Sequence, residues 1–174
     1  MLRTIVVAKD MGRLSVRSLR IGPLLVATAI CVLFALFGNA LVGESLGTWY
    51  DTLDKPWFFV PLWAFYIVGA LYYLLLAIVL YRILVHVNNR RGRVTSLALT
   101  LGVMFLNELW NYGFFGLQNT LVGFLGIVVF LVPLTALLLT LRAYDRFSAT
   151  LVAVYWIWVL YDLACFYTLW RLNS

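Results

Sequence analysis

The charged residues of this chain fall into short clusters, and the stretches between them match the thickness of a lipid bilayer. Residues 21–42 and 61–81 contain no Asp, Glu, Lys or Arg. Residues 94–141 contain only Glu108, and residues 147–170 contain only Asp162. A helix needs about 20 apolar residues to cross the hydrocarbon core. The spacing of the charges therefore predicts a chain made almost entirely of transmembrane helices.

The third uncharged stretch is long enough for two helices, and residues 116–119 (Gly-Leu-Gln-Asn) have the composition of a turn between them. We expect an all-α integral membrane protein, a bundle of five transmembrane helices. A basic N-terminal segment, residues 1–20, would precede a single membrane domain, residues 21–174. The predicted helices cover residues 21–42, 61–85, 95–116, 120–142 and 148–170.

Composition supports helices in a membrane. Hydrophobic residues make up 64% of the chain and charged residues 11%, against about 45–50% and about 25% in ordinary soluble domains. The alternative membrane architecture, a β-barrel, would show alternating polarity over about ten residues. Here consecutive residues are apolar on every face, which favours helices.

The basic residues predict an orientation. Lys and Arg concentrate on the cytoplasmic side of membrane proteins, and with five helices three basic clusters share one side. These clusters are Arg3, Lys9, Arg13, Arg17 and Arg20; Arg82, Arg90, Arg91 and Arg93; and Arg142 and Arg146. We expect a multi-pass protein of the cell (cytoplasmic) membrane with its N-terminus inside. The net charge of +6 is then topological, and no nucleic-acid partner is expected.

Two features of the chain exclude other readings. The first apolar run is longer than the core of a signal peptide, and no A-x-A-like site follows it, so we expect an uncleaved helix. Cys31 and Cys165 are far apart in the sequence and have no nearby His, so we expect packing residues and no metal site.

The first connection carries the most information. Residues 49–61 are rich in aromatic side chains, and Pro56 and Pro61 stiffen the segment. Two interpretations remain open. The aromatic residues could form an ordinary belt at the membrane surface, or the segment could be a lid over a cavity between the helices.

Polar residues within the predicted helices favour a cavity. Asn107, Glu108 and Asn111 alternate with Trp110 and Phe114, while a second set in the last helix, Tyr155, Trp158 and Asp162, recurs at i, i+3 and i+7. Polar groups in a membrane usually face the bundle interior or water. Glu108 and Asp162 should lie at similar depth, roughly 20 Å from the inner end. They could line a cavity, neutral or paired with Lys55, or each could hydrogen-bond a neighbouring helix.

These residues resemble the translocator protein family, also called tryptophan-rich sensory proteins (TspO/MBR). The family's loop pattern is met by Trp49, Tyr50, Leu53, Lys55, Pro56, Phe58, Pro61 and Trp63. Its third-helix pattern is met by Asn107, Trp110, Phe114, Phe115 and Gly116, and its fifth-helix pattern by Tyr155, Trp158, Trp170, Arg171 and Asn173. The resemblance covers the chain from about Trp49 to Asn173.

The resemblance implies a five-helix bundle, often a homodimer, with a pocket closed by the first loop. Members of the family bind tetrapyrroles and, in some cases, cholesterol and synthetic ligands. Residues 163–171, which include Tyr167, fit the proposed cholesterol-recognition pattern. Some bacterial members are reported to promote light- and oxygen-dependent breakdown of protoporphyrin. A family Trp linked to that activity corresponds here to Gly69, which follows Val68.

We therefore expect a binding or sensory membrane protein for a flat apolar ligand, a tetrapyrrole (porphyrin- or haem-related) or a sterol-like molecule. No cofactor is required, although porphyrin or haem could be bound. One alternative is a porphyrin-degrading enzyme that uses Trp158. Another is a small proton-coupled transporter built on Glu108 and Asp162, ranked last because transporters usually show internal repeats. The expected ligand-binding residues are Trp49, Tyr50, Lys55, Pro56, Trp63, Asn107, Glu108, Trp110, Asn111, Phe114, Tyr155, Trp158 and Asp162.

Overall fold

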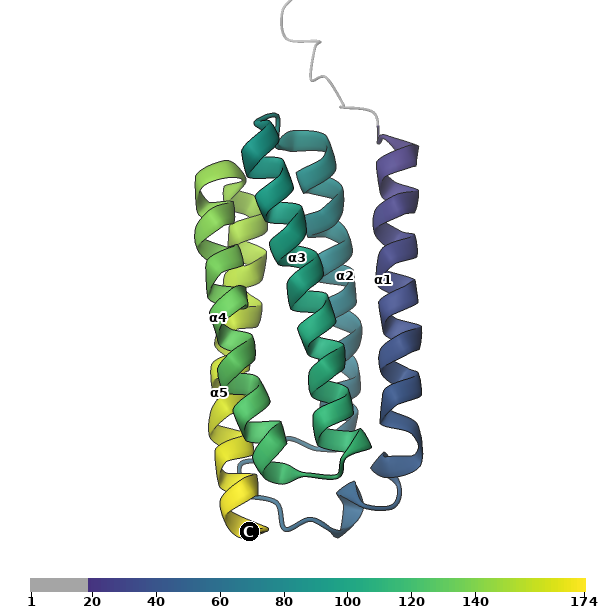
Figure 1. Ribbon diagram of the computed structural model, residues 1–174, viewed down its shortest axis with the longest axis vertical. Helices are drawn as coiled ribbons and strands as arrows, with labels where there is room; N and C mark the ends of the chain where they lie inside the picture. Colours follow the sequence, from purple (N-terminus) through teal and green to yellow (C-terminus); the bar gives the residue numbers. More distant parts are fainter. Residues whose placement is uncertain (1–18) are drawn as a thin grey trace, which may run out of the picture.

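The computed structural model describes residues 19–174, which form five long helices that run up and down along one axis (Figure 1). The described residues contain no β-strand, so the all-helical prediction is confirmed for them, while residues 1–18 of the predicted basic segment lie outside them. The long helices are α1 (Ile21–Val42), α2 (Leu62–His86), α3 (Arg90–Asn111), α4 (Thr120–Tyr144) and α5 (Arg146–Leu172). Shorter turns are η2 (Gly43–Leu46), η3 (Tyr50–Thr52) and the π-helical turn η4 (Tyr112–Gly116), which continues α3.

Helices α3 and α5 begin earlier than predicted, because their first residues are basic and lie outside the apolar runs. The side chain of Asn89 caps α3 by accepting a hydrogen bond from the backbone N–H of Gly92 at 2.8 Å. This bond satisfies a donor that the helix leaves free. Helix α5 begins at Arg146, directly after Asp145. Apolar length locates the part of a helix that can lie in lipid, and not the full helix.

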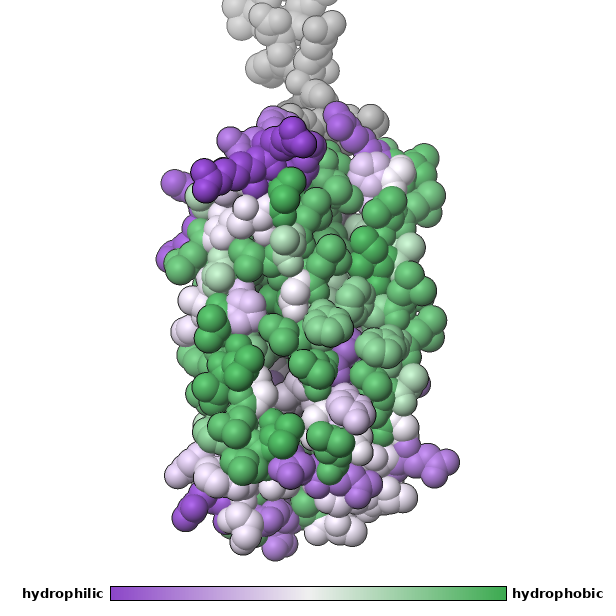
Figure 2. Space-filling view, in the orientation of Figure 1, coloured by the Kyte–Doolittle hydropathy of each residue, from purple (hydrophilic) through white to green (hydrophobic). Residues whose placement is uncertain are grey.

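Four of the five helices are long and apolar enough to cross a membrane: α1, α2, α4 and α5. Helix α3 does not meet the same criterion, because it starts with Arg90, Arg91 and Arg93 and carries polar residues near its other end. In Figure 2 a broad hydrophobic band separates hydrophilic groups at the two ends of the bundle. This distribution is the one that a bilayer environment requires.

Helices α4 and α5 pack along each other, α3 packs on α4, and α1 lies at the edge of the bundle against α2 and α3 (Figure 1). Most of the buried side chains form one core among α2, α3, α4 and α5. A smaller cluster joins α1 to the bundle through Ala27 and Cys31, which pack with Tyr72, Leu76 and Met104. Cys31 and Cys165 are both free and buried, as a packing role predicts.

An ion pair closes the end of the bundle opposite the first loop. The guanidinium of Arg82 donates two hydrogen bonds of 2.8 Å to the carboxylate of Asp145, and the hydroxyl of Ser148 donates another at 2.6 Å. Burial by itself would raise the pKa of Asp145, but the hydrogen bonds from Arg82 and Ser148 hold that pKa below its ordinary value. The carboxylate therefore stays charged and joins α2 to the start of α5.

The first loop, residues 43–61, folds across the other end of the bundle and is fastened to α5 at two points. The Tyr161 hydroxyl donates to the carbonyl of Phe58 at 2.9 Å and accepts from the backbone N–H of Val60 at 3.1 Å. The amide of Asn173 exchanges two hydrogen bonds of 2.9 Å with the backbone of Asp54. These four bonds join the loop to positions more than a hundred residues later in the chain.

Candidate functional site

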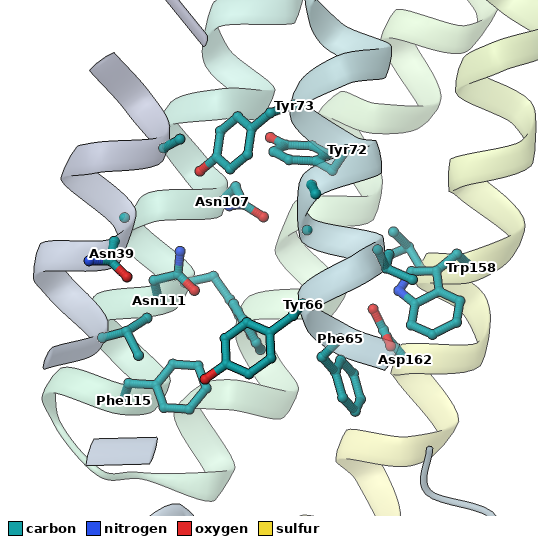
Figure 3. A pocket seen from close by; sticks show the side chains of 18 of the residues that line it. Asn39, Phe65, Tyr66, Tyr72, Tyr73, Asn107, Asn111, Phe115, Trp158 and Asp162 are labelled. Atoms are coloured by element: carbon teal, nitrogen blue, oxygen red, sulfur yellow. The ribbon is translucent and has the colours of Figure 1, made fainter. Parts of the chain in front are cut away.

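A cavity of about 370 Å³ lies in the half of the bundle nearest the first loop. Residues from all five long helices and from the loop line it, and most of the large side chains among them are aromatic. Figure 3 shows lining side chains grouped around the space, with the principal ones labelled. The volume is within the range of about 300–1,000 Å³ that is usual for small-molecule sites.

Helix α5 supplies one wall of the cavity, and the face predicted from the sequence is the one that lines it. Tyr155, Trp158 and Asp162 all border the space. The Phe65 ring lies 6.0 Å from that of Trp158 at a steep angle, with Asp162 beside both in Figure 3. One carboxylate oxygen of Asp162, Oδ1, is buried and has no hydrogen-bond partner.

Helix α3 supplies the opposite wall through Asn107, Trp110 and Asn111. The indole N–H of Trp110 donates to the carbonyl of Gly123 at 2.8 Å, which fixes the ring against α4. The same ring stacks on Phe114, with 5.5 Å between the ring centres. Trp110 is thus held from two directions and presents a rigid aromatic surface to the cavity.

Glu108 lies behind this wall and not in the cavity. Its side chain is 0% exposed, and its carboxylate accepts hydrogen bonds from the hydroxyl of Tyr73 at 2.5 Å, from Asn111 at 2.8 Å and from Asn107 at 3.2 Å. Glu108 therefore follows the second of the two interpretations, in which an acid hydrogen-bonds a neighbouring helix. Asp162 follows the first and lines the cavity.

The expected pairing of an acid with Lys55 is not formed. The ammonium of Lys55 donates to the backbone carbonyl of Tyr50 at 2.8 Å and lies 4.5 Å from the centre of the Tyr50 ring. Within residues 19–174 the ion pair that the structure contains joins Arg82 to Asp145. Lys55 stabilises the loop that covers the cavity, because backbone carbonyls take up its charge.

The loop combines both interpretations of its aromatic residues. Tyr50 is 4% exposed and lines the cavity, so this part of the loop is a lid. Trp57 is 95% exposed and Trp63 is 64% exposed, which suits belt residues at a membrane surface. Pro56 is buried within the loop and does not border the cavity.

Two other expected residues, Trp49 and Phe114, lie outside the cavity wall. Their rings are 5.1 Å apart, and Phe114 is 0% exposed. Phe114 is the centre of an aromatic cluster that also contains Tyr50, Trp110, Phe115 and Phe166. The other four members line the cavity, and Phe114 supports them from behind, so the cluster joins the loop to α3 and α5.

Helices α1 and α2 contribute cavity residues that the sequence did not reveal, because the parts of both helices that line the cavity carry no charged residue. Four of them carry polar atoms: Asn39, Tyr66, Tyr72 and Tyr73. The sequence signal that could have identified them is a polar side chain, Asn or Tyr, within an otherwise apolar stretch. Gly69 also lines the cavity, and no atom lies within 4 Å of the place where a side chain would begin there.

The wall is mainly aromatic and carries only a few polar groups. It carries aromatic faces, three Asn amides, Tyr hydroxyls and one carboxylate, with no Lys, Arg or His. Among residues 19–174 no three His, Cys, Asp or Glu side chains come together in a way that could hold a metal ion. Such a wall can stack on a flat molecule and meet it with a few hydrogen-bonding groups.

Comparisons with known proteins agree with this architecture. The model of the TspO/MBR family matches residues 27–171. The tryptophan-rich protein TspO of Archaeoglobus fulgidus is 33% identical over 86% of this chain and 97% of its own length. The protein CrtK of Rhodobacter capsulatus is 31% identical over 74% of this chain and 81% of its own. A tryptophan-rich sensory protein of Cereibacter sphaeroides is 26% identical over 72% and 77%. The chain therefore belongs to the TspO/MBR family and is an integral, multi-pass membrane protein.

Proposed function

We propose that this protein is a sensory membrane protein that binds a tetrapyrrole in the cavity beneath the first loop. The observation that carries the proposal is the cavity itself, about 370 Å³ in volume and bordered by aromatic side chains from α2, α3, α4 and α5. Aromatic faces gain most from a flat conjugated partner, because stacked rings attract beyond the area they bury. A sterol has no π-system to stack, so it fits this wall less well.

The proposed binding mode uses the loop as a lid. Tyr50 touches the cavity, and the hydrogen bonds from Tyr161 and Asn173 hold the loop in place. A ligand would enter when these bonds open and be enclosed when they close. The name of the relative in Cereibacter sphaeroides, a tryptophan-rich sensory protein, supports a sensory role.

Titration of tryptophan fluorescence with protoporphyrin tests the proposal. We expect saturable quenching of the purified protein, and for Trp158→Leu, which removes the ring, a binding constant weakened about three- to tenfold, because a stacked ring contributes about 0.5–1.5 kcal/mol. Trp57→Leu is the matched control: Trp57 is 95% exposed, so its replacement should leave the affinity unchanged. Linear, unsaturable quenching, or equal affinity in the Trp158 and Trp57 variants, would contradict the proposal, as would tighter binding of cholesterol.

Light-driven breakdown of the bound porphyrin is the second candidate activity, because Trp158 borders the cavity. Binding ranks ahead of it, since Gly69 leaves open space where the family Trp would stand. Illumination of the same complex in air separates the two. An unchanged porphyrin spectrum fits binding alone, and bleaching that Trp158→Phe abolishes fits the enzyme.

We further propose that α3 is a fifth membrane span, that the N-terminus is inside, and that the protein forms a homodimer. Helix α3 runs alongside the other four for most of the bundle's length (Figure 1). Its acid, Glu108, is fully buried, so the lipid does not meet the charge. Alkaline phosphatase is active only outside the cytoplasm. A fusion after Ser174 should therefore be active, and an insertion at Val87, between α2 and α3, should be inactive. The reverse pattern would overturn the orientation.

A further inference from the structure

Asp162 is the one acidic side chain among the described residues that line the cavity. The other lining residues are apolar, aromatic or neutral and polar, with no Lys, Arg or His among them. Its Oδ1 atom is buried without a hydrogen-bond partner. A buried carboxylate oxygen without a donor is costly, and folded proteins rarely leave one in that state.

No basic group of the described chain satisfies this oxygen. Lys55, the basic residue of the loop, donates to the carbonyls of Tyr50 and Leu53. Arg82 is paired with Asp145 at the far end of the bundle. The other buried acid, Glu108, has three donors of its own. Trp158 is the neighbouring side-chain donor to the Asp162 carboxyl group, and Oδ1 has no partner among the described residues. A donor carried by a molecule in the cavity could therefore satisfy Oδ1.

The surroundings of Asp162 specify what kind of donor fits. Phe65 and Trp158 stand beside the carboxyl group in Figure 3, with 6.0 Å between their ring centres. Aromatic faces attract organic cations through the ring quadrupole. A cation bound there would also favour the ionised form of the Asp162 carboxyl group, which burial alone disfavours. The same carboxylate repels a ligand carboxylate, and no basic residue in the wall offsets that repulsion.

We propose that Asp162 is the specificity-determining residue of the cavity, selecting flat ligands with a positively charged nitrogen and rejecting those that would bury a carboxylate. This inference rests on the proposed function, in which the cavity binds a flat apolar molecule. For a tetrapyrrole the matching groups are the N–H groups of the ring, which become cationic when the imine nitrogens are protonated, and acidic side chains would stay at the mouth of the cavity under the loop.

Three acridines of one ring shape and different charge test the proposal at neutral pH. 9-Aminoacridine is cationic, acridine is neutral and acridine-9-carboxylate is anionic, and each can be titrated by its own fluorescence against the protein in an uncharged detergent. We expect the wild-type protein to bind the cation about tenfold or more tightly than the neutral ring, since hydrogen bonds to charged groups are the strong ones. The anion should bind most weakly.

Asp162→Asn should reduce the difference in affinity between the cationic and the neutral acridine to less than about threefold, because it keeps the shape of the side chain and removes the charge. Asp51→Asn is the matched control: it removes a carboxylate from the exposed loop and should keep the wild-type difference in affinity among the three acridines. Asp162→Ala serves as a second variant if the Asn variant does not elute as a folded protein. The proposal is overturned if the Asp162 variants keep the wild-type difference in affinity among the acridines, or if the wild-type protein binds all three equally.

Neutral protoporphyrin dimethyl ester, titrated in parallel, separates this inference from the proposed function. If the ester binds while the acridines show no preference for charge, the selectivity of Asp162 is refuted and the tetrapyrrole site stands. If the acridines show the preference while the ester does not bind, Asp162 selects cations and the tetrapyrrole is the wrong ligand.

Discussion

Replacing Gly38 with alanine should destabilise the protein by about 2–4 kcal/mol, through one methyl group at the junction of α1 and α3. A Cβ at Gly38 would overlap the carboxylate of Glu108 and touch the amide of Asn111. The carboxylate cannot simply turn aside, because Tyr73, Asn107 and Asn111 all donate to it. Either α1 moves away or three buried hydrogen bonds are disturbed.

Gly102→Ala is the matched control for Gly38→Ala. Gly102 is also inside a helix, but no atom lies within 4 Å of its missing Cβ. Alanine there should be neutral or stabilise by up to about 1 kcal/mol, because alanine is the better helix former. Thermal unfolding in detergent, followed by size exclusion, measures both. The double variant Gly38→Ala/Glu108→Ala lacks the collision, so its loss of stability should be smaller than the sum of the losses in the two single variants. If the losses of stability are additive, the contact is refuted.

Phe114→Ala should cost about 3–5 kcal/mol of stability, the usual range for a fully buried Phe. The ring is 0% exposed and lies 5.1 Å from Trp49, 4.9 Å from Phe166 and 4.7 Å from Phe115, measured between ring centres. Its loss leaves a void behind the cavity wall and removes the surface on which Trp110 stacks. Ligand binding should weaken together with stability, although Phe114 does not border the cavity.

Phe105→Ala tests whether that cost comes from the aromatic cluster. Phe105 lies on the same helix, α3, but is 57% exposed, so its truncation should cost less than about 1 kcal/mol. Chemical denaturation of both variants in the same lipid–detergent mixture gives the comparison. Equal losses in the two variants would show that Phe114 has no special part in the bundle.

The helices could be predicted from the sequence because their signal is local. A run of uncharged residues as long as a bilayer is thick needs no knowledge of neighbouring segments. The face of α5 was predictable for the same reason, since Tyr155, Trp158 and Asp162 follow from the helical period alone. The start of α3 was less predictable, because the Asn89 cap lets the helix begin before the apolar run. Helix α5 also begins before its apolar run, at Arg146, and has no side-chain cap.

The rest of the site depends on contacts between segments that are distant in sequence. Asn107 and Glu108 are adjacent, yet one lines the cavity and the other is buried behind it, because Tyr73 on α2 draws the carboxylate away. A sequence pattern on α3 alone does not reveal this. The lining residues of α1 and α2 could not be selected either, since uniformly apolar helices show no preferred face.

The fastening of the loop to α5 also determines when during synthesis the cavity can exist. Tyr161 lies 101 positions after Val60, and Asn173 lies 119 positions after Asp54. Translation at about 5–20 residues per second therefore separates each pair by roughly 5–25 seconds. Through that interval the loop residues have been made but their partners have not. The ligand site can thus form only after α5 has been made, so the ligand cannot act as an early template for insertion, and it can first be enclosed once Asn173 has been synthesised.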